Sequence, residues 1–257
     1  MLRTEFLPPK TRATFERLRG DPLLKGFTLV GGSALALQIG HRISEDLDFN
    51  FIGSRLPVKR ISTLLENLES EGVQVTSLIP NEKKVAFRIN TGRVLDSHIQ
   101  DYAMGGTKIT FHARTTDDRP KAQIEHLKRA RRVAWDSGQG FDILAVEGLF
   151  VMKTLVLFDR ARSRDVFDLM VLTRDHGYTL ADMERIVQSL QPASDRDFER
   201  CKGILTGQLA LDKDDEGFES IGLDYKVSDL YGYFSVAVDD YERAIVEELL
   251  NPAARGE

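Results

Sequence analysis

Two aspartates one residue apart, Asp46 and Asp48, have the spacing of a metal site. Successive side chains of a β-strand point to opposite faces, so both carboxylates would share one face while Leu47 points to the other. Mg²⁺ prefers one or two carboxylates together with water and substrate phosphates. The pair therefore predicts a magnesium site that acts on a phosphate-bearing substrate.

A glycine turn precedes the two acids. Gly31 and Gly32 follow the apolar run Phe27–Val30, and without Cβ atoms they let a ligand approach the backbone closely. Ser33 is expected to cap the helix that follows, and the backbone N–H groups at the start of this helix would favour a phosphate. Each feature alone is commonly structural, as a strand-to-helix turn or a polar strand edge. At this spacing the two together predict nucleotide chemistry.

Local signals predict the elements that position the turn and the acids. The apolar run before the glycines is expected to be a buried strand, the next helix to end at Gly40, and the acids to begin a second strand. Periodicity and turn residues predict further elements. These are helices over Lys10–Arg19 and Val58–Glu71, and strands over Val73–Ile79, Lys84–Asn90, Val94–Tyr102 and Lys108–Arg114. Such a series indicates an α+β fold whose mixed sheet is extended by antiparallel hairpins.

A third acid would complete a site for two metal ions. Asp96 is the candidate, because a strand over Val94–Tyr102 would place it on one face with Val94 and His98. Asp101 competes for the same role. An aspartate in a strand is equally well explained by a solvent-facing position, so the sequence leaves the third acid open.

The stretch GGSALALQIGHRISEDLDF resembles the signature of the AbiEii/AbiGii toxin family of nucleotidyltransferases, within the DNA polymerase β-like superfamily. The superfamily pattern is a GG or GS turn, a pair of acids, and a third acid on a later strand. Arg42 and Ser44 also match the family's R-x-S/T-x-D-x-D form. The resemblance implies that Gly31, Gly32, Ser33 and Arg42 bind the nucleotide, and that Asp46, Asp48 and Asp96 bind Mg²⁺ and serve catalysis.

A second match lies further along the chain. Lys153, the run Arg160–Asp165 and Asp168-Leu169 follow the family's order of a lysine, R-x-x-x-R-D and x-x-D-L. The resemblance implies that Lys153 and Asp165 act beside the nucleotide. Fixed positive charge stabilises phosphoryl-type transition states, so Lys153 is expected at the triphosphate, with Asp165 orienting it or meeting the substrate. For Arg164 and Asp168 we expect an internal Arg–Asp network that ties helices together.

Net charge, cysteine count and the distribution of apolar residues limit the partners and the compartment that we expect. The chain has 257 residues and a formal net charge of −5, so no overall basic field indicates nucleic-acid binding. Cys201 is the single cysteine and excludes an intrachain disulfide. The sequence contains neither a signal-peptide pattern nor an apolar run of membrane-spanning length. A cytoplasmic protein without a membrane partner is expected.

One local segment is strongly basic. Arg119–Arg132 carries six cations and could follow an RNA backbone, although a solvated helix face is the more ordinary interpretation. Trp135 comes shortly after this segment. It is expected to anchor the segment in the core and not to stack on a base.

We expect a nucleotidyltransferase lobe over residues 1–138 and a mostly helical lobe over residues 139–257. The resemblance implies that an NTP donates its NMP to an acceptor hydroxyl in a Mg²⁺-dependent reaction. RNA, at the tRNA 3′ end, is the favoured acceptor, and the chain would be the toxin of a pair with a cognate antitoxin. The alternatives are transfer to a protein or small-molecule hydroxyl, and a non-catalytic module that binds a nucleotide or a partner.

Overall fold

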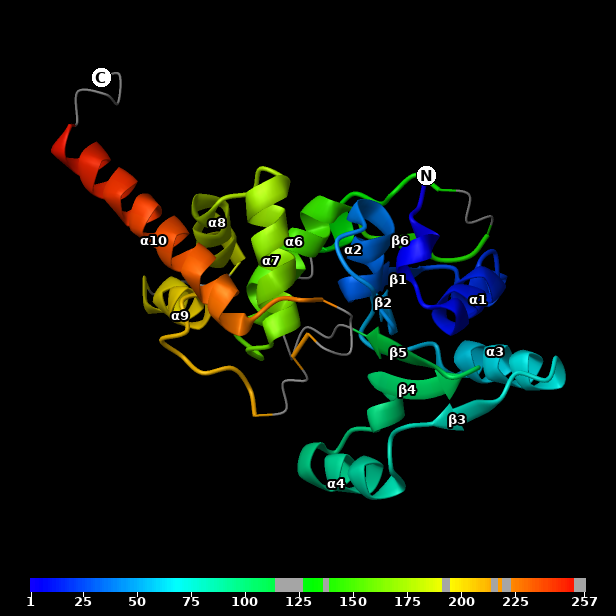
Figure 1. Cartoon of the computed structure of the whole chain (residues 1–257). Helices are drawn as coiled ribbons and strands as arrows, with labels where there is room; N and C mark the ends of the chain where they lie inside the picture. Colours follow the sequence, from blue (N-terminus) through cyan, green and yellow to red (C-terminus); the bar gives the residue numbers. More distant parts are fainter. Residues whose placement is uncertain (114–126, 136–138, 191–194, 214–216, 219–222, 252–257) are drawn as a thin grey trace. The chain divides into compact units, whose positions relative to one another are not determined.

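The computed structural model describes residues 1–113, 127–135, 139–190, 195–213, 217–218 and 223–251 (Figure 1). The chain separates into two compact units, Met1–Leu149 and Phe150–Glu257, and the division falls within helix α6 (Val146–Val156). Each unit is considered by itself. Among the described residues, no helix combines the length and the apolar character needed to cross a membrane.

Unit 1 is built on a six-stranded mixed sheet with the order β3-β4-β5-β2-β1-β6. Strand β2 pairs antiparallel with β1 and parallel with β5, so the strand that contains Asp48 lies inside the sheet. The other pairs are antiparallel for β3–β4 and β4–β5 and parallel for β1–β6. The strands are β1 (Phe27–Val30), β2 (Leu47–Phe51), β3 (Val75–Ser77), β4 (Ile99–Met104), β5 (Thr107–Ala113) and β6 (Asp142–Ile143).

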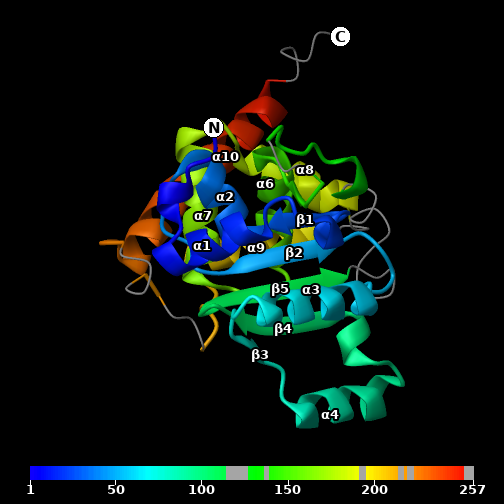
Figure 2. The same ribbon diagram turned by 90° about the vertical axis from the view of Figure 1, so that its right-hand side faces the viewer.

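Helices and short 3₁₀ turns connect these strands (Figures 1 and 2). They are η1 (Thr4–Phe6), α1 (Pro9–Leu18), η2 (Pro22–Leu24), α2 (Gly31–Ile39), α3 (Val58–Ser70), α4 (Asn81–Thr91) and η3 (Leu95–Ser97). The expected helices over Lys10–Arg19 and Val58–Glu71 are confirmed within one residue at either end.

Aromatic packing fixes one face of the sheet. The ring of Phe49 lies 4.8 Å from that of Phe141 and 5.6 Å from that of Phe111. Because strand side chains alternate, the burial of Phe49 turns Asp48 to the opposite face. Burying large aromatic side chains is among the strongest contributions to a core, so this packing also sets which way the acid points.

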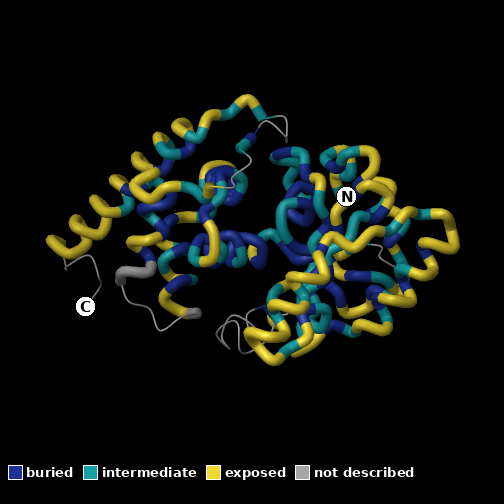
Figure 3. Tube along the Cα trace, turned by 90° about the horizontal axis from the view of Figure 1, so that it is seen from below, coloured by how far each residue is buried: buried dark blue, intermediate teal, exposed yellow. Residues whose placement is uncertain are grey.

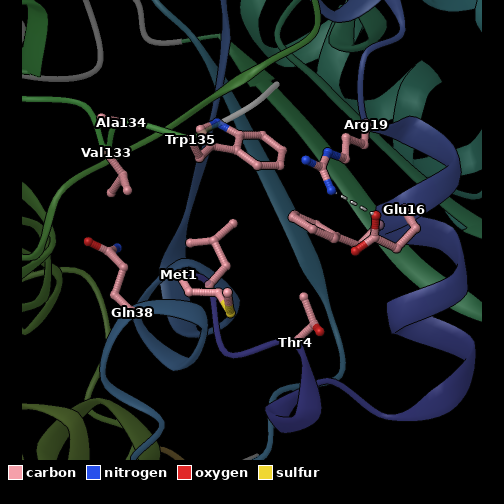
Figure 4. Close-up of a pocket in the computed structure, with 10 residues that line it drawn as sticks. Met1, Thr4, Glu16, Arg19, Gln38, Val133, Ala134 and Trp135 are labelled. Atoms are coloured by element: carbon pink, nitrogen blue, oxygen red, sulfur yellow. Dashed lines mark hydrogen bonds and ion pairs between the residues drawn. The ribbon is translucent and has the colours of Figure 1, made fainter. Parts of the chain in front are cut away.

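Trp135 belongs to the same aromatic cluster, as expected for an anchor. Its ring stacks on Phe15 of α1 at 5.5 Å and lies 5.1 Å from Phe141, with the Arg19 guanidinium over it. Trp135 also borders a pocket of about 540 Å³ near the first residues of the chain (Figure 4). The residues that line this pocket do not include Asp46 or Asp48.

The strand predicted over Lys84–Asn90 is wrong, because these residues lie in helix α4. Pro80 precedes the helix, and Gly92 ends it in the left-handed conformation with φ +69°. Both residues are ordinary helix boundary signals, and Val85 and Ile89 have helical i, i+4 spacing. The alternation that suggested a strand was the weaker signal.

Unit 2 is helical, as expected. After the end of α6 it contains α7 (Ser163–Asp175), α8 (Leu180–Leu190), α9 (Asp195–Leu205) and α10 (Val227–Leu250). Helix α10 contacts the three preceding helices, and Leu230, Phe234 and Val238 on its inner stripe are buried. Phe150 stacks on Tyr178 at 4.2 Å.

Candidate active site

The two acids lie where β2 begins beside the glycine turn. Asp48 is paired across β1 with Val30, the residue before the turn, and across β5 with Thr110. Asp46 comes one residue before the strand, and its Oδ2 lies 3.9 Å from the Lys108 Nζ. Both aspartates are partly exposed. The sheet therefore presents two solvent-accessible carboxylates at one end of its central strand.

Gly31 forms the closest contact between the turn and the acids. Its φ is +75°, a conformation that favours glycine, and a Cβ at this position would lie 2.7 Å from the Asp48 Oδ2. The carboxylate thus lies directly against the backbone that opens α2. A side chain here would displace the acid, which gives a physical reason for glycine at this position.

Ser33 does not cap α2, so that prediction is wrong. The helix begins at Gly31, and Val30 occupies the N-cap position. Ser33 is 1% exposed, and its hydroxyl donates to the backbone carbonyl of Asp46 and lies 2.9 Å from the Ser44 hydroxyl. The serine side chain therefore ties the acid-bearing loop to the first turn of the helix.

Arg42 occupies the remaining space beside the turn. A Cβ at Gly32 would lie 2.6 Å from the Arg42 Nη2 and 3.0 Å from the Ser44 Oγ. Arg42 is 6% exposed, and its Nη1 donates to the carbonyl of Ile43 at 3.0 Å. Positive charge is thus built into the loop beside the start of α2, where an anion is also favoured by the helix N-terminus.

The predicted strand position of Asp96 is wrong, because the residue lies in the 3₁₀ turn η3 and β4 starts only at Ile99. Its Oδ1 lies 3.0 Å from the Lys84 Nζ of α4. The expected shared strand face with Val94 and His98 is therefore not formed. A catalytic role for Asp96 stays a prediction.

Asp101, the competing candidate for the third acid, does lie in a strand, β4. It pairs with Thr110 of β5, and Thr110 pairs with Asp48 of β2. Residues directly opposite in neighbouring strands point to the same face, so the three side chains form one row across the sheet. The Asp101 Oδ1 is buried and has no hydrogen-bond partner within the described part of the chain.

These carboxylates fit one metal ion better than two. Asp46 and Asp48 supply the one or two protein carboxylates that Mg²⁺ ordinarily takes, and a substrate phosphate and water would complete its oxygen ligands. Within the described ranges, no three or more His, Cys, Asp or Glu side chains are grouped so that they could hold a metal ion. The described residues thus offer a two-carboxylate site.

Unit 2 holds the second set of candidate residues as a buried ion-pair cluster. The Lys153 Nζ of α6 lies 2.6 Å from the Asp165 Oδ1 and 2.6 Å from the Asp168 Oδ2, both on α7. Arg160 adds a contact of 2.8 Å between its Nε and the Asp165 Oδ2. Lys153, Asp165 and Asp168 are 6%, 2% and 0% exposed. The cluster joins the two helices that carry it.

The charges in this cluster are mutually compensated. Burial by itself would raise the pKa of Asp165, but the positive charges and hydrogen bonds of Lys153 and Arg160 outweigh it and lower the pKa. Asp165 is therefore held ionised and fixes the Lys153 ammonium. Asp168 is an internal ion-pair partner of Lys153, and the Arg164 Nε donates to the Gly217 carbonyl at 3.3 Å.

Only the end of the basic segment lies within the described residues, and Arg119 and Lys121 lie outside them. Arg131 forms an ion pair with Glu147. Arg132 donates to the carbonyls of Ala130 and Leu127. At least these two arginines serve local structure.

Comparison with known proteins identifies one family and several similar proteins. A family model described as "Nucleotidyl transferase AbiEii toxin, Type IV TA system" matches residues 15–226. An uncharacterized protein of Aquifex aeolicus is 23% identical over 183 residues, which cover 71% of this chain and 74% of the relative. The crystal structure of JHP933 from Helicobacter pylori is similar with a TM-score of 0.47 and 15% identity, covering 96% of this chain and 97% of that one. MenT4, a nucleotidyltransferase toxin of Mycobacterium tuberculosis, is similar with a TM-score of 0.45 and 14% identity, over 94% and 93% of the two chains.

Proposed function

Because the chain belongs to the AbiEii family of nucleotidyltransferase toxins, we propose that it transfers an NMP from an NTP to an RNA hydroxyl in a Mg²⁺-dependent reaction. Membership makes the chain a nucleotidyltransferase with an NTP substrate, of a toxin–antitoxin type. The metal, the acceptor and the partner are the proposed parts. The observation that carries the metal site, and with it the proposed transfer, is the pair Asp46 and Asp48, with the Asp48 carboxylate against the Gly31 backbone.

The proposed reaction is a substitution at the α-phosphorus of the NTP. A bond forms between the acceptor oxygen and the α-phosphorus, the bond to the β-phosphate oxygen breaks, pyrophosphate leaves, and the hydroxyl proton passes to solvent. A bound Mg²⁺ would be held by Asp46 and Asp48, and it would supply charge neutralisation at the phosphates. The backbone of Gly31 and Gly32 would approach the phosphates, with Arg42 adding positive charge beside them.

Lys153 and Asp165 are proposed to act on the same substrate. Asp165 is the positioning residue in this proposal, since it lies 2.6 Å from the Lys153 Nζ and keeps the ammonium in one place. Lys153 would face the triphosphate, where a fixed cation stabilises negative charge in the transition state. Either Asp96 or Asp101 is proposed as a third acid, and the cross-strand row with Asp48 favours Asp101.

The acceptor is proposed to be the 3′ end of a tRNA in the cytoplasm, with a cognate antitoxin as the regulatory partner. The family description supports the antitoxin. The RNA assignment rests on the family resemblance and on the basic character of the segment from Arg119 to Arg132.

One observation favours a second candidate function. The described residues do not bring three carboxylates together, and a two-metal transferase ordinarily uses such a group. A module that binds a nucleotide or a partner without transfer is therefore the alternative. Transfer to a protein or small-molecule hydroxyl is a further outcome of the same assay.

The test mixes purified chain, Mg²⁺, total tRNA and each α-labelled NTP in turn, with Asp46→Ala and Asp48→Ala as variants. Glu45→Ala is the matched control, because Glu45 is an exposed neighbour of the acid pair. We expect label on tRNA, a loss of at least about a hundredfold in both aspartate variants, and full activity in the control. Label on protein would reassign the acceptor. Intact NTP binding without any label would favour the non-catalytic module.

A further inference from the structure

Helix α4 presents an uncovered apolar stripe. Val85 and Ile89, one helical turn apart, are 57% and 77% exposed, and no side chain of the helix is buried. Its inner side contacts η3, and the Phe87 ring lies 6.3 Å from that of His98, the residue after η3. Figures 1 and 2 show α4 beyond the β3 edge of the sheet. Isolated helices of this length are marginal in water, so a covering partner would stabilise α4.

The charge around this stripe is positive. From Asn81 to Arg93 the sequence carries four cations and one acid, Glu82. On a helix, Arg88 lies beside the stripe on one side and Glu82 on the other. Lys83 lies towards the far side of the helix, and Lys84 is paired with Asp96. An apolar centre with a charged rim is the usual anatomy of a protein interface. The net positive charge of the segment from Asn81 to Arg93 indicates a partner surface that is acidic.

The end of helix α10 has the opposite charge. Its buried stripe through Val238 continues into Ile245 and Leu249, which are 37% and 66% exposed, and Leu250 is 75% exposed. Figure 3 shows this end of the helix exposed over its last turns. From Asp239 to Leu250 the sequence carries five acids and one arginine. This surface is again apolar at its centre, but its rim is acidic.

We propose that the exposed end of α10 in one copy of the chain packs on α4 of a second copy. The two stripes have opposite charge and similar length, about 16 Å for the 11 residues of α4 and about 13 Å for Glu242–Leu250. The chain has a net charge of −5, so copies repel one another in general. Association therefore depends on the cationic surface of α4 meeting the acidic end of α10.

Sedimentation velocity of the full chain tests the proposal. We expect species larger than the monomer whose fraction rises with protein concentration at about 0.1 M salt. The fraction should fall at about 1 M salt, where the Debye length shrinks from about 10 Å to about 3 Å. A monomer at every concentration would overturn the proposal, whether the two surfaces stay uncovered or are covered within one chain.

Charge reversal identifies the surfaces. Lys83→Glu with Arg88→Glu should weaken self-association at least tenfold, and Glu247→Lys with Glu248→Lys should do the same. The chain carrying all four changes should recover association, because the charges are again opposite. These are exposed positions, and circular dichroism would verify that each variant is folded. Failure of the fourfold variant to recover would overturn the pairing of α4 with α10.

The same variants test whether RNA, and not a second copy of the chain, covers α4. If α4 instead binds RNA, the unchanged chain and all its variants should be monomeric, and the Lys83→Glu, Arg88→Glu variant should lose RNA binding. That result would replace the proposal. Self-association that is unchanged by both charge reversals would show that the contact lies elsewhere, and would also overturn the proposal. The experiment contains neither NTP nor Mg²⁺, so its outcome is independent of the proposed transferase activity.

Discussion

Removing Asp168 tests the buried cluster of unit 2 most directly. Asp168 is fully buried, and its Oδ2 lies 2.6 Å from the Lys153 Nζ. Truncating one partner of a buried ion pair costs about 3–5 kcal/mol, because the other charge stays buried. In Asp168→Ala the lysine would keep Asp165, so we expect the lower end, about 3 kcal/mol. For a chain of this size that corresponds to a Tm about 6–12 °C lower.

The assay is urea and thermal unfolding at pH 7, with a matched surface variant. Asp240 forms an exposed ion pair with Arg243, and Asp240→Ala should cost no more than about 1 kcal/mol. A double-mutant cycle adds Lys153→Met and Asp168→Leu, singly and together. The pair replaced together should be more stable than the sum of the single losses predicts, since hydrophobic residues substitute well for a buried ion pair.

A loss in Asp168→Ala as small as that of the surface control would refute this reasoning. Additive losses in the cycle would also refute it, because they would show that Lys153 and Asp168 do not interact energetically. Either result would mean that the lysine is not held as a charged group between the two aspartates.

Acid titration probes the same cluster through Asp165. Its pKa is lower in the folded chain than in the unfolded chain, so its contribution to stability is complete above the unfolded value, about 3.9. That contribution is lost as the pH falls through the folded value. We expect stability to decline in this acid range, and to decline less in Lys153→Met, which removes one source of the shift. Equal declines in both chains would contradict the assignment.

Three further changes test unit 1. Gly31→Ala should destabilise the fold by about 1–3 kcal/mol and abolish transfer, because φ is +75° and the new Cβ would lie 2.7 Å from the Asp48 Oδ2; unchanged kinetics would argue against the close approach. Ser33→Ala should lower activity and cost about 1 kcal/mol, since the partly buried Asp46 carbonyl loses its donor; denaturant unfolding and the transfer assay measure both. Trp135→Ala should cost about 3 kcal/mol without changing nucleotide binding, and lost nucleotide binding in a folded chain would give the tryptophan a substrate role.

Local sequence signals are enough to predict the structure at the centre of unit 1. The strand Phe27–Val30, the two glycines and the alternation around Asp48 are properties of neighbouring residues, so the sequence predicts the turn and the direction of the acid. The same holds for Asp165 and Asp168, whose spacing of three puts them on one face of a helix. Family membership, also carried by sequence, supplies the nucleotidyltransferase activity.

Contacts between distant segments decided the remaining features. Strand register, which depends on pairing and not on local pattern, placed Asp101 in a row with Asp48 and left Asp96 in a 3₁₀ turn beside Lys84. The Ser33 hydroxyl was expected at a helix cap, but the fold of the loop before β2 offered it a carbonyl 13 residues away. Only packing of α6 on α7 could show that the Lys153 charge is shared by two buried aspartates. Propensity and periodicity act over a few residues, whereas these contacts depend on how whole elements meet.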